Sequence, residues 1–333
     1  MAKTRDYRLV WIKFLACILV IVLHGMKPGQ NLQEYIYLLG SYGVPLFFLV
    51  NGYLRSHRIT DWAVLKKNTV RFVGFALLWA ALTSALHLLK ERRFVFFSYL
   101  FGAFLGKERL VHFWFFFALL VIYAIAALLT ALLGDDRLKA LAAKPQTAYL
   151  VILLMTLSFT ANLLLKRYAG MEIKELIPAP FRVITNGGFF VLGMHQALRE
   201  KTKPSVNNWV LLALAPLCTL LLWLAAKRTG IVWASSYYAS LPVILYGILF
   251  LDSFRVGERL LKAAVLRTVI GTSTGVWILH PFVLTGLDRI EALLQIGKTV
   301  PVSLGNILAA LVLSVAVTLV LQRIKGLRML VSP

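Results

Sequence analysis

Acidic residues are scarce in this 333-residue chain: 14 Asp and Glu stand against 36 Lys and Arg, and charged residues make up only 15% of the sequence. A soluble domain carries about 25% charged and about 45–50% apolar residues. Here 59% of the residues are hydrophobic and the mean hydropathy is +0.78. These proportions exclude a cytosolic globular domain, a disordered chain and a collagen-like chain, and they predict a protein that crosses a lipid bilayer several times.

Cysteine is nearly absent, which excludes a disulfide-stabilised secreted scaffold. The two cysteines, Cys17 and Cys218, lie in apolar segments and are predicted to be small core residues. No Cys and His spacing typical of a metal site is present, so no metal is expected. The formal charge of +22 comes from Lys and Arg scattered between apolar segments. This pattern indicates loops held at an anionic membrane surface, with no nucleic acid as a partner.

Ten segments are apolar over about the 20 residues that a helix needs to cross a bilayer. They lie at about residues 9–26, 35–54, 70–88, 113–133, 148–165, 182–198, 208–226, 231–251, 267–287 and 302–321. Lys13 interrupts the first segment and no small-residue cleavage site follows it, so we expect a retained span rather than a signal peptide. No internal repeat and no long linker are visible. The prediction is an all-α polytopic membrane protein with about ten transmembrane helices in a single domain over residues 1–333.

A further apolar segment, residues 94–105, is too short to cross a bilayer. Phe94, Phe97, Phe101 and Phe104 recur at helical spacing, and basic residues bracket the segment on both sides. This pattern is typical of a helix that lies in the membrane interface. A short re-entrant or tilted helix is the alternative.

The distribution of Lys and Arg predicts the orientation. With the N-terminus inside, the inner segments carry 21 basic residues and the outer loops carry 14. An even number of spans then places both termini in the cytoplasm.

Ionisable side chains within membrane spans are costly and therefore mark candidate functional sites. Lys13 and His24 enclose ten consecutive apolar residues. Their separation of eleven positions turns an α-helix by about 20° beyond three full turns, so both side chains lie on one face, roughly 16 Å apart along the axis. The alternative is that Lys13 extends to the inner interface and His24 caps the outer one.

Other polar residues lie deep in the spans or at their outer ends. His280 is followed by Pro281, which breaks the helical hydrogen bonding there. His112 and Trp114 open one predicted span, and Arg182 and Asn186 open another. Under the predicted topology these residues lie in the outer half, together with His24.

Five stretches together resemble the membrane-bound acyltransferase 3 family, in the family's order. They are residues 13–24, in which a basic residue precedes a histidine by eleven positions; 43–54, GVPLFFLVNGYL; 112–123, HFWFFFALLVIY; 187–193, GGFFVLG; and 271–281, GTSTGVWILHP. The length and tail are similar to those of the enterobacterial-common-antigen O-acetyltransferase type. Three positions differ from the family pattern: Lys13 stands where Arg is usual, Val10 where an acidic residue is usual, and Asn51 where Ser is common. Lys replaces a bidentate clamp by a point charge.

The resemblance implies transfer of an acyl group, most often acetyl, from cytoplasmic acyl-coenzyme A to a hydroxyl of an envelope glycan or lipid-linked saccharide at a bacterial inner membrane. Lys13 is then the donor-binding residue, and His24 is the general base or the carrier of a covalent acyl group. His280 binds the acceptor or orients the site. Further acceptor-binding candidates are Asn51, His112, Trp114, Arg182 and Asn186.

Two other classes of function remain open from the sequence. Ten helices with prolines and charges inside the membrane also suit a transporter or a flippase of a lipid-linked saccharide. A scaffold role is possible but leaves the shared face of Lys13 and His24 unexplained. Within the enzyme class, a succinyl donor and an exopolysaccharide acceptor are alternatives.

Overall fold

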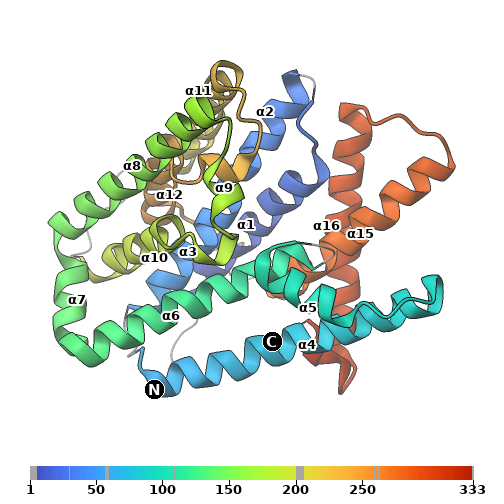
Figure 1. Ribbon diagram of the computed structural model, residues 1–333, viewed down its shortest axis with the longest axis horizontal. Helices are drawn as coiled ribbons and strands as arrows, with labels where there is room; N and C mark the ends of the chain where they lie inside the picture. The colour runs from blue at the N-terminus through green and yellow to red at the C-terminus, as the bar shows by residue number, and fades with distance from the viewer. Residues whose placement is uncertain are drawn as a thin grey trace.

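The computed structural model describes residues 6–29, 31–56, 60–107, 110–199, 206–257, 260 and 263–331. Within these ranges the regular elements are all helical, as predicted (Figure 1). They are α1 (Tyr7–Gly25), α2 (Asn31–Leu39), η1 (Gly40–Tyr42), α3 (Gly43–Arg55), α4 (Trp62–Glu91), α5 (Phe96–Leu105), η2 (Val111–Phe113), α6 (Trp114–Leu133), α7 (Asp135–Ala143), α8 (Pro145–Ala169), α9 (Ile173–Leu176), η3 (Ala179–Phe181), α10 (Val183–Leu198), α11 (Asn208–Thr229), η4 (Ala234–Tyr237), α12 (Leu241–Ser253), α14 (Ala264–Ile270), α15 (Ser273–Leu293), α16 (Val300–Arg323) and η5 (Leu327–Leu330).

Seven of the described helical segments are long and apolar enough to cross a membrane, and the pair α14 and α15, bent by 58°, makes an eighth if it counts as one span. Each of the ten segments predicted from the sequence contains a helix. Two of these are shorter than a full span, because α10 has 16 residues and α12 has 13. The predicted segment 231–251 is divided by a break between η4 and α12, where Pro242 occupies the first turn of α12. The chain is a multi-pass, all-α membrane protein.

Polar side chains define several helix starts, since the first turn of a helix leaves backbone N–H groups without partners. Asp6 accepts from Arg8 N at α1, Asp61 from Val64 N at α4, and Asn207 from Val210 N at α11. At the opposite end, Gly170 closes α8 with a φ of 69°, a left-handed conformation that glycine adopts without strain.

The short segment predicted at residues 94–105 forms α5, which packs against α4. Phe97 and Phe101 are exposed, whereas Tyr99 is buried. Phe104 turns inward and its ring lies 5.1 Å from that of Phe117. An apolar face on a short helix is compatible with the membrane interface, and its position relative to the bilayer stays a prediction.

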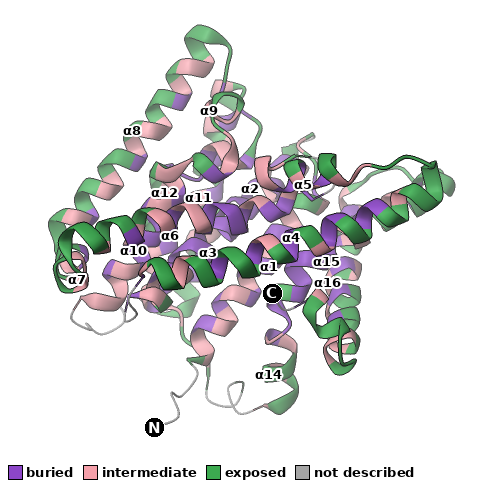
Figure 2. Ribbon diagram, turned by 60° about the horizontal axis from the view of Figure 1, so that its bottom comes forward, coloured by how far each residue is buried: buried purple, intermediate pink, exposed green. Residues whose placement is uncertain are grey.

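Helix α3 lies at the centre of the bundle, between α1 and α10 (Figure 1). Every residue from Gly43 to Val50 is buried, whereas α8 at the periphery is mostly half-buried or exposed (Figure 2). Two glycines let the backbones of α3 and α10 touch. A Cβ atom on Gly52 would overlap the Phe190 carbonyl oxygen, and one on Gly193 would overlap the Leu49 carbonyl oxygen. Small residues commonly allow such close packing of membrane helices.

Candidate active site

Three histidines from three separate elements meet inside the bundle. The ring of His24, near the end of α1, lies with its centroid 5.3 Å from that of His280 in α15. The ring of His112, in η2, lies 6.3 Å from that of His280. We call these three residues the histidine cluster. Among the described residues no group of three or more His, Cys, Asp or Glu is arranged to hold a metal ion.

The three histidines differ in how exposed they are. His280 is fully buried and His112 is 3% exposed, whereas His24 is exposed. His24 is therefore the most accessible member of the cluster.

The proton position on His280 follows from its hydrogen bond. Its Nδ1 lies 3.1 Å from the carbonyl oxygen of Val276, which can only accept, so Nδ1 carries the proton in the neutral ring. Its Nε2 has no partner among the described atoms. A buried nitrogen with a free lone pair usually has a functional explanation. Here it can accept a hydrogen bond from a hydroxyl group brought next to His24.

A second feature, the basic pocket, lies nearer the start of α1. It has a volume of about 200 Å³ and contains the side chains of Lys13 and Arg71, and none of its described lining residues is acidic. The other lining residues supply three polar side chains and six apolar ones: Asn51, Ser273, Thr274, Phe47, Phe72, Phe115, Phe116, Leu119 and Trp277. Arg71 is exposed, so the pocket reaches the surface at this side chain. Two cations beside an apolar recess suit an anionic group that carries an apolar arm.

Three helices connect the basic pocket to the histidine cluster. Along α1, Lys13 lines the pocket and His24 belongs to the cluster. Along α15, Thr274 lines the pocket and His280, six positions later, belongs to the cluster. From η2 into α6, His112 precedes Leu119 of the pocket by seven residues. The pocket and the cluster therefore follow one another along each of these three segments.

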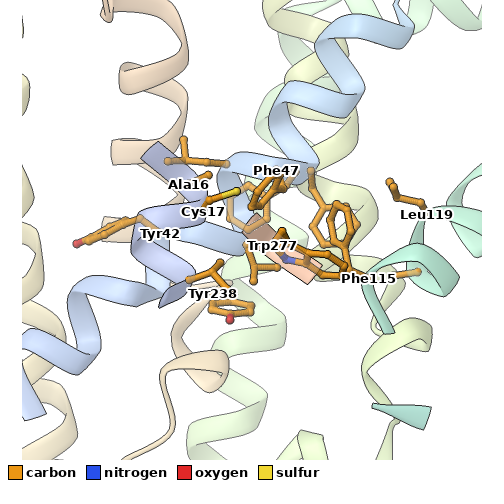
Figure 3. Close-up of a cluster of buried hydrophobic side chains, with 14 of the residues drawn as sticks. Ala16, Cys17, Tyr42, Phe47, Phe115, Leu119, Tyr238 and Trp277 are labelled. Atoms are coloured by element: carbon orange, nitrogen blue, oxygen red, sulfur yellow. The ribbon is translucent and has the colours of Figure 1, made fainter. Parts of the chain in front are cut away.

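A cluster of buried hydrophobic side chains adjoins the basic pocket, several of whose lining residues belong to it (Figure 3). Trp277 and Phe47 lie at its centre beside the sulfur of Cys17, and Phe115 lies toward Leu119. The Trp277 indole is 5.6 Å from the Phe115 ring and 5.3 Å from the His112 ring. Cys17 is buried and its Sγ donates to the Ser273 carbonyl oxygen at 3.0 Å.

Asn51 and Trp114, two predicted acceptor-binding residues, lie outside the histidine cluster. Asn51 lines the basic pocket with Lys13, and its Nδ2 donates to the Phe47 carbonyl oxygen at 2.8 Å. Trp114 packs its ring 6.2 Å from that of Phe48 and 6.4 Å from that of Phe115. The predicted candidate His112, in contrast, joins the histidine cluster.

Arg182 and Asn186 hold the loop before α10 in place. Arg182 Nε donates to the Ile177 carbonyl oxygen at 3.0 Å, and Asn186 Nδ2 donates to the Ala179 carbonyl oxygen at 2.9 Å. Arg182 also lines a separate pocket of about 30 Å³ with Lys174. Burial lowers the pKa of Lys174 from its ordinary value, against the opposing effect of the Glu172 carboxylate 3.5 Å away. The role of Arg182 and Asn186 in binding an acceptor stays a prediction.

Sequence reasoning did not single out Arg71 or Trp277. Arg71 was counted with the basic residues at the start of a span, and only the packing of α4 against α6 brings it to the pocket. Trp277 lies within the resemblance stretch 271–281, three residues before His280. That spacing places both side chains on one side of a helix and was the available signal.

Fold and site together define a helical membrane protein in which a cationic pocket and an accessible histidine lie in series within the bundle. The model of the acyltransferase 3 family, described as an acyltransferase domain, matches residues 6–323, and the chain belongs to this family. No curated protein and no solved structure gives a significant match. The protein is thus a membrane-bound acyltransferase, which favours the enzyme interpretation over the transporter or flippase that the sequence left open.

Proposed function

We propose that this protein transfers an acetyl group from cytoplasmic acetyl-coenzyme A to a hydroxyl of a cell-envelope glycan or lipid-linked saccharide in a bacterial inner membrane. The observation that carries the proposal is the order of sites on α1: Lys13 lines a cationic pocket, and His24, eleven residues later, is exposed within the histidine cluster. A donor with phosphates at one end and a thioester at the other matches this order.

The donor end of the site is the basic pocket. Lys13 and Arg71 neutralise phosphate charge of coenzyme A, and Arg71 adds a planar guanidinium able to bind two oxygens at once. The pantetheine arm enters between the aromatic side chains, with Asn51, Ser273 and Thr274 as hydrogen-bonding groups for its amides. With both termini in the cytoplasm, this end of α1 faces the cytoplasmic supply of the donor.

The chemical step takes place at His24. Its neutral imidazole removes the proton from the acceptor hydroxyl, the oxygen attacks the thioester carbonyl carbon, and the carbon–sulfur bond breaks. The proton held by His24 then passes to the thiolate of coenzyme A. His280 Nε2, which has no partner among the described atoms, accepts a hydrogen bond from the sugar and fixes its position.

A covalent form of the same reaction uses the imidazole as nucleophile. One ring nitrogen of His24 then takes the acyl group from the thioester, and the leaving thiolate takes the proton of the other ring nitrogen and departs as coenzyme A. The hydroxyl oxygen next takes the acyl group, and the hydroxyl proton returns to the imidazole. Both forms require the same residues and the same order of sites.

The test is transfer of radiolabel from acetyl-coenzyme A in membranes that contain the native lipid fraction, for wild type, Lys13→Ala and His24→Ala. The proposal predicts labelled glycan or glycolipid with wild type and at least about 100-fold less with His24→Ala. Label that stays on wild-type protein and is absent from His24→Ala identifies the covalent form. No label in glycan, lipid or protein with wild type would refute acetyl-coenzyme A as the donor.

A further inference from the structure

One side chain belongs to both halves of the site. Trp277 lines the basic pocket, and its ring centroid lies 5.3 Å from that of His112 in the histidine cluster. It lies midway on α15 between Thr274, which lines the pocket, and His280, three positions from each. The indole therefore occupies the end of the pocket nearest to the histidines.

The walls around this indole are rigid. Its ring lies 5.0 Å from that of Phe116 and 5.6 Å from that of Phe115, and the residue is only 6% exposed. Aromatic side chains packed in this way have little freedom to move aside, because protein interiors are close-packed. An apolar group entering from the Lys13 side packs against this indole before it reaches the histidines.

The pocket is small for a long ligand. Its volume of about 200 Å³ has to accept the end of the pantetheine arm together with the acyl group. A pocket end lined by packed aromatic side chains discriminates against a ligand with extra methylene groups, since added volume has to displace those side chains.

We propose that Trp277 is the end wall of the donor pocket and sets the length of the acyl group, so that the enzyme uses acetyl-coenzyme A and rejects thioesters of longer chains. This inference rests on the proposed function. Trp277 acts on specificity through its volume and takes no part in bond making. Replacing the indole by a smaller side chain widens the end of the pocket beside the histidine cluster, where the thioester meets His24, and admits longer acyl chains.

The experiment measures kcat/KM for acetyl-, propionyl-, butyryl- and hexanoyl-coenzyme A with wild type, Trp277→Phe and Trp277→Leu in membranes with the native acceptor lipid. Wild type should prefer acetyl. The ratio of butyryl to acetyl transfer should rise at least about tenfold in Trp277→Leu and by a smaller factor in Trp277→Phe.

Trp79 provides the matched control. It is also 6% exposed and packs against Phe113, at a ring distance of 6.4 Å, but it does not line the basic pocket. Trp79→Leu removes the same volume from the same aromatic core, so it should lower stability without changing the ratio. A ratio that rises equally in Trp79→Leu and Trp277→Leu would overturn the proposal, since general loosening would then explain it.

A second measurement reports donor binding in variants that fold but have no transferase activity. Thermal stabilisation of the purified protein by the thioethers S-ethyl- and S-butyl-coenzyme A gives relative binding without chemistry. Trp277→Leu should shift the preference from S-ethyl toward S-butyl. An unchanged preference, or transfer ratios within about threefold of wild type, contradicts the end-wall role. Absence of transfer from every thioester by wild type instead refutes the proposed function, so the two failures are distinguishable.

Discussion

His24 and His280 face each other across the bundle with their ring centroids 5.3 Å apart and their planes inclined by 40°. They are 256 residues apart in the chain and are brought together because α1 packs against α15. The first ring is exposed and the second is fully buried with an unpartnered Nε2. An accessible base beside a fixed hydrogen-bond acceptor is an arrangement suited to activating a hydroxyl group.

If these two histidines act as a unit, their effects on the rate are not additive. His280→Ala should lower kcat at least about tenfold by itself. The double variant His24→Ala, His280→Ala should be no slower than His24→Ala alone, because the step that His280 supports is already lost. Initial rates of the two single variants and the double variant test this. Rates that fall by the product of the two single effects would show that the histidines work independently.

The pH dependence of the rate has a definite sign. The base at His24 has to be neutral to take a proton from the hydroxyl, so the rate should fall as the pH falls and reach a plateau at higher pH. On the acid side the fall should approach about tenfold per pH unit, as expected for one proton. A rate that shows no acid limb at any pH at which the protein stays folded would argue against an imidazole base. The residual activity of His24→Ala, measured in parallel, should lack the acid limb.

Arg71 should contribute to donor binding although sequence reasoning did not identify it. Arg71→Ala should raise KM for acetyl-coenzyme A by about threefold to fivefold, since the side chain is exposed and solvent weakens its electrostatic contribution. Arg71→Lys should retain part of the effect. Lys66 lies on the same helix, is also exposed and does not line the pocket, so Lys66→Ala is the matched control. Equal KM changes in Arg71→Ala and Lys66→Ala would mean that only the overall charge of the surface matters.

The contact between α3 and α10 should be intolerant of any added side chain. Gly193→Ala places a Cβ atom against the Leu49 carbonyl oxygen, where backbone has to move, so it should lower the free energy of unfolding by about 1–3 kcal/mol. Gly187→Ala on the same helix meets only Val183 Cγ1 at 3.5 Å and should be tolerated. Thermal unfolding of the two purified variants makes the comparison. Equal stability of both would contradict the close packing.

Much of the fold could be predicted from the sequence, because hydropathy over about 20 residues is a local property. All ten apolar segments contain helices, and the short segment 94–105 forms α5. The lengths of α10 and α12 were not predictable, since the break before α12 and the loop before α10 depend on tertiary packing. The resemblance in five ordered stretches agrees with the family assignment of residues 6–323.

The candidate site could be predicted only in part. The spacing of Lys13 and His24 along one helix is a geometric consequence of the sequence, and the structure places them in the basic pocket and the histidine cluster. The meeting of His24 with His280 depends on which helices pack together, which no local pattern encodes. Asn51, predicted to bind the acceptor, lines the same pocket as Lys13, because α3 packs against α1, and its role stays a prediction.

Donor binding and chemistry should occupy different ends of α1, and one kinetic comparison separates the two roles. Initial rates are measured against acetyl-coenzyme A concentration for wild type, Lys13→Ala and His24→Ala in the same membranes. We expect Lys13→Ala to raise KM about 10- to 100-fold with little change in kcat, and His24→Ala to lower kcat at least about 100-fold with little change in KM. The same change in KM and kcat for both variants would contradict the separation of the two sites.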